Sequence, residues 1–410
     1  MGLMVYPNKT NRFAFILLLC LFIATYFEYF FRGVNMIFWF ILFFLAVISV
    51  SRNRGALNSS GIQTIYLYGI GTFFACLFQA FTNPSVSIIY SFGQVLLLSC
   101  FLLLAIATKE SLLEKLVLLM TVIATYSIII YAICSFFPPI KDYLVNDISS
   151  RFPSLGVEKA IQEGGGINFV IYNFQLASEY ATLFRNCGPF WEPGMFAVFL
   201  DIALFVNIFI LRGNRFVNIV LIVALLSTMS TGGYIGGLFI VFTYAILERK
   251  NVILSIVSVF LLVIFIYYFF ETEFLGDKLL YQMTNTTIGD DSSRFGALQT
   301  HLKMFIDHPL WGHYGIEGYV IDDRRALASG LLIPLSSRGI FVGGLYYLLL
   351  YKASVNYSLF YSRSKRTGVF LFLFILLLSI SQTILLTSCI CVFIFAGLLL
   401  ESNTNRYATV

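Results

Sequence analysis

Residues 185–194 place charged side chains beside the start of a helix. Arg185 and Glu192 lie seven residues apart, and Pro193 fits the first turn of the helix that follows. Glu192 would then be held next to the N-terminal end of that helix, where the dipole favours a negative charge. An arginine can bind an anion and a carboxylate can accept a proton from a hydroxyl group, so this segment could act on a charged substrate. The alternative is ordinary capping at a membrane interface, with Trp191 as the anchor.

A second candidate segment begins at Arg294. Ser292 or Ser293 can cap a helix that starts there and should end at His308–Pro309. The apolar stripe of this helix consists of Phe295, Leu298, Leu302 and Phe305. Arg294 and His301 share one face, and a tight turn that contains His313 follows the helix. A surface helix with a snorkelling arginine remains the alternative.

Three more polar features lie inside apolar segments. Arg338 is near the outer half of a predicted span, and an arginine at membrane depth is costly unless it faces a wet cavity or an anion. We therefore favour a functional role for Arg338. The small-residue segment 227–233 permits close helix packing, which we favour, or a broken helix that faces a cavity. For Glu28 and Asp201 we favour hydrogen-bonded core carboxylates over a proton path.

The elements that must position these residues are membrane helices. Of 410 residues, 59% are hydrophobic and only 11% are charged, and the mean hydropathy is +0.86. A soluble domain is about one quarter charged, so this chain must be solvated by lipid. Six of the seven cysteines lie in apolar segments and imply no disulfide framework. No basic tract suggests binding of nucleic acid. The first apolar run lacks a cleavage motif and is interpreted as a retained helix.

The hydropathy pattern predicts an all-α integral membrane protein with about 12 transmembrane helices in one polytopic domain, residues 1–410. The expected spans are 13–31, 33–50, 62–81, 87–107, 113–136, 193–211, 216–230, 234–247, 252–270, 330–350, 368–383 and 385–400. The last two come from one long apolar run, which we expect to turn near Ser381–Ile384. Lysine and arginine are concentrated in short loops and tails on one side, so both termini should be cytoplasmic.

Two large loops, residues 137–191 and 271–329, fall on the outer side in this topology. They hold all three histidines and most of the acidic residues. Loops of this size on a membrane scaffold are usually functional, so any chemistry should be extracytoplasmic. Both loops should contain short helices, the first from about Asn168 to Leu183 along the membrane surface.

In their order along residues 180–350, these motifs resemble the O-antigen polymerase and ligase superfamily, the Wzy and WaaL type of membrane glycosyltransferase. The matching positions are Arg185, Gly188, Glu192-Pro193-Gly194, the Ser/Thr-Gly segment 227–233, Ser293-Arg294, Pro309 to Gly315, Ser329 and Gly339-Ile340. The resemblance implies a GT-C-like fold in the bacterial cytoplasmic (inner) membrane, with the active site facing the periplasm. It also implies a polymerase that joins undecaprenyl-diphosphate-linked oligosaccharides, one as donor and one as acceptor, by inverting glycosyl transfer. Membrane lipid and a chain-length-regulating protein are the other expected partners.

The resemblance also assigns roles to residues. Arg185 and Arg294 match the two essential arginines of the superfamily and would bind the departing diphosphate, and we add Arg338 as a third. Ligases of the superfamily carry a histidine in a His-Asn pair where this chain has Ala328-Ser329-Gly330-Leu331, which argues against a ligase. Glu192 is our first candidate for the base, followed by His313 and then His301. No metal-binding motif marks the outer loops, so we expect catalysis without a metal or cofactor.

Two other functions stay open at this stage. A ligase of the same superfamily would attach a finished polymer to its lipid core. A flippase or transporter for lipid-linked oligosaccharides would also have about twelve helices and cationic cavity residues. The large one-sided loops and the lack of related halves argue against a transporter. A non-catalytic assembly subunit is the least favoured alternative.

Overall fold

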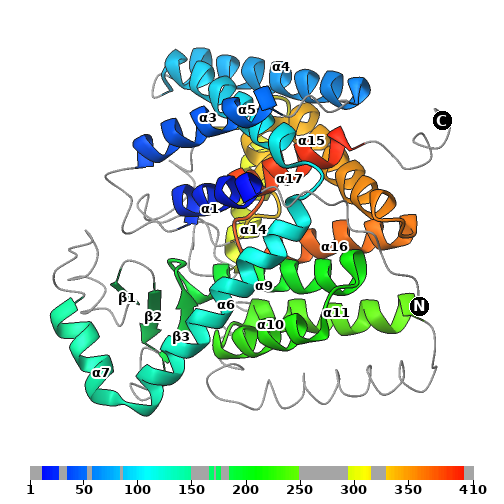
Figure 1. Ribbon diagram of the computed structural model, residues 1–410. Coiled ribbons are helices and arrows are strands. Elements are labelled where there is room, and N and C mark those ends of the chain that lie inside the picture. The colour runs from blue at the N-terminus through cyan, green and yellow to red at the C-terminus, as the bar shows by residue number, and fades with distance from the viewer. Residues whose placement is uncertain are drawn as a thin grey trace.

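Long helices make up most of the computed structural model, which describes residues 12–26, 35–52, 58–83, 86–148, 166–169, 172–176, 184–248, 294–314 and 329–400 (Figure 1). The first part contains α1 (Arg12–Tyr26), α3 (Asn35–Arg52), α4 (Ser59–Thr82), α5 (Ile88–Thr108), α6 (Leu112–Phe136), α7 (Pro138–Tyr143) and the π-helical turn η1 (Leu144–Ile148). The second part contains α9 (Pro193–Phe205), its π-helical continuation η3 (Val206–Leu211), α10 (Arg215–Ser227), α11 (Thr231–Glu248), α14 (Arg294–Asp307), α15 (Ile333–Phe360), α16 (Lys365–Ser381) and α17 (Ser388–Leu399).

Five helices within the described residues are long and apolar enough to cross a membrane. They are Ser59–Thr82, Ile88–Thr108, Leu112–Phe136, Pro193–Leu211 and Ile333–Phe360. Each of the other expected spans also contains a helix, except 252–270, which lies outside the described residues. The expected break in the last apolar run is confirmed, because α16 ends at Ser381 and α17 begins at Ser388.

Side-chain caps fix where several of these helices begin. Asn58 accepts a hydrogen bond from the Gly61 amide at the start of α4, and Ser364 does the same for Thr367 at the start of α16. Such caps satisfy amides that have no partner within the helix. The local sequence therefore sets these boundaries.

A small antiparallel sheet replaces part of a helix that the sequence pattern suggested. The strands are β1 (Gly166–Phe169), β2 (Tyr172–Leu176) and β3 (Phe184–Gly188), in the order β1-β2-β3. The prediction of a helix from Asn168 to Leu183 is wrong over the end of β1 and over β2, and residues 170–171 and 177–183 lie outside the described part. The strand is favoured because side chains two residues apart point to the same face of a sheet. Tyr172 and Phe174 are both buried in this way and pack with Phe184 against the end of α6.

The helices form two adjacent groups. In one group α3, α4, α5, α15 and α17 pack together, and in the other α6, α10, α11 and α16 surround α9. Figure 1 shows α4 and α5 at the top and α9, α10 and α11 below. Every residue of α9 is buried, which makes it the centre of the second group.

Helix α15 is interrupted where the segment after α14 packs against it. Gly339 has φ 71° inside α15, and the amide of the next residue, Ile340, donates to the Pro309 carbonyl at 2.7 Å. The His313 amide donates to Ser336 at 2.8 Å. A Cβ atom on Gly339 would overlap the Leu310 carbonyl, so glycine is required both for the positive φ and for the close approach.

Candidate functional site

Three charged side chains from separate elements come together at one end of the α9 group. Arg185 lies on β3, Glu192 immediately precedes α9, and Arg294 begins α14. Burial lowers the pKa of Arg185 and of Arg294, and the nearby Glu192 carboxylate partly offsets the fall for both. Arg185 also lowers the pKa of Arg294, since the two cations repel. We call these three residues the arginine–glutamate site.

Glu192 does not serve as an ordinary cap. It occupies the N-cap position of α9 with extended backbone angles (φ −148°, ψ 154°), but its side chain makes no capping hydrogen bond. The carboxylate is half-buried and close to the two guanidinium groups. The carboxylate therefore does not cap α9, although its Oε1 lies 3.8 Å from the position of a Cβ atom on Gly194 in the first turn.

Arg185 is held by the strand on which it lies. Its Nε donates to the Thr228 carbonyl at 3.2 Å. The neighbouring Asn186 is fully buried, donates from Nδ2 to Ser227 Oγ at 2.9 Å, and accepts at Oδ1 from the Gly188 amide at 2.9 Å. These bonds connect β3 to the C-terminal end of α10. The small-residue segment 227–233 therefore contributes the Thr228 carbonyl that binds Arg185.

Arg294 lies between two helix ends. Its Nη1 donates to the Ser381 carbonyl in the last turn of α16, where the helix dipole favours a cation. A Cβ atom on Gly232, near the start of α11, would lie 3.8 Å from the same Nη1. The same Cβ atom would overlap the Ser381 side chain, so glycine at this position lets the start of α11 approach the end of α16 beside the guanidinium.

The site also contains the N-terminal ends of two helices. The start of α9 lies against Gln382, because a Cβ atom on Gly194 would overlap the Gln382 amide nitrogen. The start of α11 lies against Ser381, the residue before Gln382, because a Cβ atom on Gly232 would overlap the Ser381 side chain. Helix N-termini attract anions, as do guanidinium groups. The two arginines outnumber the one carboxylate, so the site can hold an anionic group next to a potential proton acceptor.

The face of α14 that turns inward differs from the expected apolar one. The buried residues of this helix are Gly296, Ala297, Thr300, His301 and Met304. Phe295 and Leu302, from the predicted apolar stripe, are 43% and 46% exposed. His301 Nδ1 lies 2.9 Å from Ser336 Oγ, and burial lowers its pKa to about 4. His301 therefore packs against α15.

Arg338 and His313 belong to a second group of residues, near α4 and α5. Arg338 is 8% exposed and donates to Cys76 Sγ on α4 and to Gln94 Oε1 on α5. The ring of His313 is 4.8 Å from that of His308. The structure thus groups Arg185, Arg294 and Glu192, and it places Arg338 with Cys76 and Gln94 instead.

Three positions at the arginine–glutamate site did not emerge from the sequence pattern. They are Asn186, Ser381 and Gln382. Gln382 had a readable signal, since an amide at the break of a long apolar run must find a polar environment. Asn186 had none, because its partners are set by how β3 meets α6 and α10.

Within the described residues, no three His, Cys, Asp or Glu side chains are grouped so as to hold a metal ion. The fold and the site define a helical membrane protein with a cationic site at one end of its helices. No protein-family model, curated protein or solved structure matches this chain.

Proposed function

We propose that this protein is a membrane glycosyltransferase that polymerises oligosaccharide repeat units linked to undecaprenyl diphosphate. The observation that supports the proposal is the grouping of Arg185, Arg294 and Glu192, from three separate segments, beside two helix N-termini. A leaving diphosphate needs fixed positive charge, and an attacking hydroxyl group must lose a proton. The arginine–glutamate site has groups for both.

The reaction follows from these groups. The acceptor hydroxyl oxygen attacks the anomeric carbon of the donor as the bond to the diphosphate oxygen breaks, and the configuration inverts. The electron pair of that bond goes to the diphosphate, whose growing charge is stabilised by Arg185 and Arg294. Glu192 accepts the hydroxyl proton. The chain would lie in the bacterial inner membrane with about twelve GT-C-like spans, both termini in the cytoplasm and this site facing the periplasm.

The test compares Arg294→Ala with Lys303→Ala in a strain that lacks its own polymerase. Both residues are on α14, but Lys303 is exposed. With membrane abundance matched, wild type and Lys303→Ala should produce a ladder of surface glycan on a gel. Arg294→Ala should yield a single repeat unit, and Arg294→Lys should recover little, because an ammonium group lacks the bidentate fork.

Other outcomes separate the alternatives. A normal ladder from Arg294→Ala would remove Arg294 from the essential residues. If deletion of the protein left full-length polymer that was not attached to its lipid core, the protein would be a ligase. Lipid-linked units retained on the cytoplasmic side would identify a flippase.

A further inference from the structure

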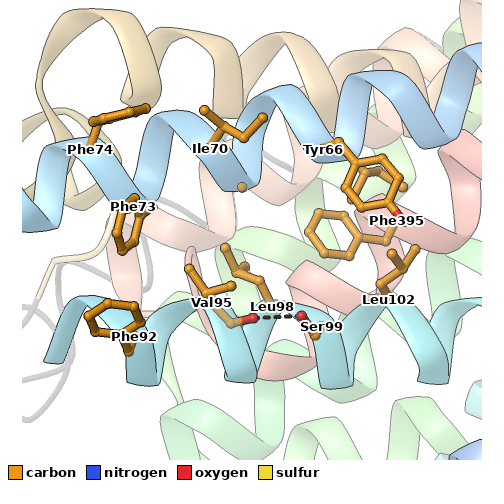
Figure 2. Close-up of a pocket in the computed structure, with 12 residues that line it drawn as sticks. Tyr66, Ile70, Phe73, Phe74, Phe92, Val95, Leu98, Ser99, Leu102 and Phe395 are labelled. Atoms are coloured by element: carbon orange, nitrogen blue, oxygen red, sulfur yellow. Dashed lines mark hydrogen bonds between the residues drawn. The ribbon is translucent and has the colours of Figure 1, made fainter. Parts of the chain in front are cut away.

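An apolar groove runs along the exposed side of α4 and α5. Its volume is about 390 Å³, and its walls are mainly aromatic and aliphatic side chains, with Phe73 and Phe92 at one end and Tyr66 and Phe395 at the other (Figure 2). Ser99 in the wall donates its hydroxyl group to the Val95 carbonyl at 2.8 Å, so its donor is already used. Both helices are candidate membrane spans. A groove of this composition suits a hydrocarbon chain.

The dimensions also fit part of a long chain. On α5 the lining extends from Phe92 to Leu102. At a rise of 1.5 Å per residue, this is about 15 Å along the helix. A Cβ atom on Gly69, which also lines the groove, would meet nothing within 4 Å, so the space beside α4 is open.

A buried cation, Arg338, lies close to the Phe73 and Phe92 end of this groove, although it is not part of the lining. Arg338 is hydrogen-bonded to Cys76, one turn beyond Phe73 on α4, and to Gln94, next to Val95 on α5. Its Nε has no hydrogen-bond partner within the described residues, and the groups that face the guanidinium are the Cys76 thiol, the Gln94 amide and the Tyr90 hydroxyl. An arginine in a membrane span without a carboxylate partner is costly, and an anionic ligand would remove much of that cost.

A second groove, of about 520 Å³, continues beyond Arg338 at the outer end of α4. Aromatic rings and amide groups line it together, including Phe78, Gln79, Trp311 and Tyr314. The rings of Phe78 and Trp311 are 5.5 Å apart. Gln79 Nε2 donates to the carbonyls of Trp311 and Ser337, which joins this groove to the turn before Arg338. Aromatic faces with polar groups at their edges suit a sugar ring, which has C–H bonds on its faces and hydroxyl groups at its rim.

We propose that these three parts, which we call the α4–α5 site, bind a second lipid-linked saccharide. The isoprenoid tail lies in the apolar groove, the phosphate lies at Arg338, and the sugars lie in the outer groove. Along α4 the apolar groove (residues 65–74), the Arg338 contact at Cys76 and the outer groove (residues 78–83) follow one another, which matches the order of tail, phosphate and sugar in such a lipid. A free sugar phosphate would leave the apolar groove empty, and a plain phospholipid would leave the outer groove without its ligand.

The role of this second lipid rests on the proposed function. A polymerase must hold a donor and an acceptor at once, and both are lipid-linked. The arginine–glutamate site has the carboxylate that a reaction centre needs. Arg338 has neutral hydrogen-bond partners, which suits binding alone. The α4–α5 site therefore holds the acceptor.

The test uses the purified full-length protein in detergent and a polyprenyl phosphate with a photoreactive group in its tail. Labelled peptides from α4 and α5 are quantified after illumination. Gly69→Phe fills the groove and should reduce this labelling about tenfold, because two or more methylene groups lose their burial. Gly93→Phe is the matched control: a Cβ atom there also meets nothing within 4 Å, and Gly93 is outside the groove lining.

The phosphate and the occupant are tested separately. Arg338→Gln should reduce labelling by polyprenyl phosphate but not by the corresponding polyprenol, which has no phosphate. An excess of undecaprenyl phosphate should displace the probe, whereas phosphatidylglycerol should not. Equal labelling of Gly69→Phe and Gly93→Phe, or equal displacement by both lipids, would overturn the proposal.

This experiment does not depend on catalysis, so the two proposals can fail separately. A glycan ladder in cells without labelling of α4 and α5 would remove the α4–α5 site and leave the polymerase. Specific labelling without a ladder would leave a lipid-phosphate site in a protein with another activity.

Discussion

Asn186 connects β3, the strand that carries Arg185, to α10, so its replacement should clearly weaken the attachment of this strand to the helices. Its side chain is fully buried and makes bonds of 2.9 Å to Ser227 Oγ and from the Gly188 amide, with a longer contact of 3.4 Å to Ser127 Oγ. Each good hydrogen bond contributes about 0.5–1.5 kcal/mol net, and a buried group left without a partner costs about 1–3 kcal/mol. Asn186→Ala should therefore lower the free energy of unfolding by about 2–4 kcal/mol.

Thermal unfolding in detergent measures this effect. With roughly 2 °C per kcal/mol for a long chain, the Tm of Asn186→Ala should fall by about 4–8 °C. Ser127→Ala is the matched control, because it removes the 3.4 Å contact and the bond from Ser127 Oγ to the Ala124 carbonyl of its own helix but leaves the two shorter bonds of Asn186, so it should shift the Tm by less than about 2 °C. The ladder should shorten in Asn186→Ala as well, since Arg185 is the adjacent residue. An Asn186→Ala protein that unfolds at the wild-type temperature would refute the argument that these bonds hold β3 in place.

Three further predictions follow from the described contacts. The folded pKa of His301, about 4, is below its ordinary 6.5, so its contribution to stability is present above pH 6.5 and is lost as the pH falls towards 4. At 1.36 kcal/mol per pKa unit this contribution is at most about 3–4 kcal/mol, and the Tm measured from pH 7 to 4 should fall less steeply in His301→Gln than in wild type. Gly236→Ala should lower the Tm, because the added Cβ atom would overlap Asp201 Oδ2. Gly237→Ala is the control and should leave the Tm unchanged, because its Cβ atom would be 3.6 Å from the nearest atom, on Leu225. Equal Tm values for the two variants would contradict the packing of α11 on α9. Glu192→Gln should slow polymerisation by about 10²–10⁴-fold in a membrane assay with lipid-linked substrate, and an unchanged rate would assign the proton to another acceptor.

Asp201 shows where a plausible sequence interpretation fails. We favoured a hydrogen-bonded core carboxylate, but neither oxygen has a hydrogen-bond partner within the described residues. The side chain is fully buried beside Gly236 and Leu378. The carboxyl group therefore owes its position to close packing against glycine, which a pattern along one helix does not display.

The positions of the helices are largely determined by the sequence itself. A backbone in lipid must satisfy its own hydrogen bonds, so each long apolar run among the described residues forms a helix. The end of α14 at Asp307 follows an equally local rule, because Pro309 cannot continue the helix, whereas the proposed caps Ser292 and Ser293 lie outside the described residues. The strand β2 is the exception: its alternating Tyr172 and Phe174 gain burial only against α6.

The tertiary structure decided which functional residues meet. Arg185 and Arg294 are far apart in sequence, and only the packing of α9, α11 and α16 brings both to Glu192. In the same packing, Arg338 is hydrogen-bonded to Cys76 and Gln94 and is not part of the arginine–glutamate site. Hydropathy is a property of each segment, and in lipid one apolar helix face resembles another. Which helices become neighbours depends on the fit of small residues and buried polar groups across the whole bundle, and that fit is fixed only when the chain is folded.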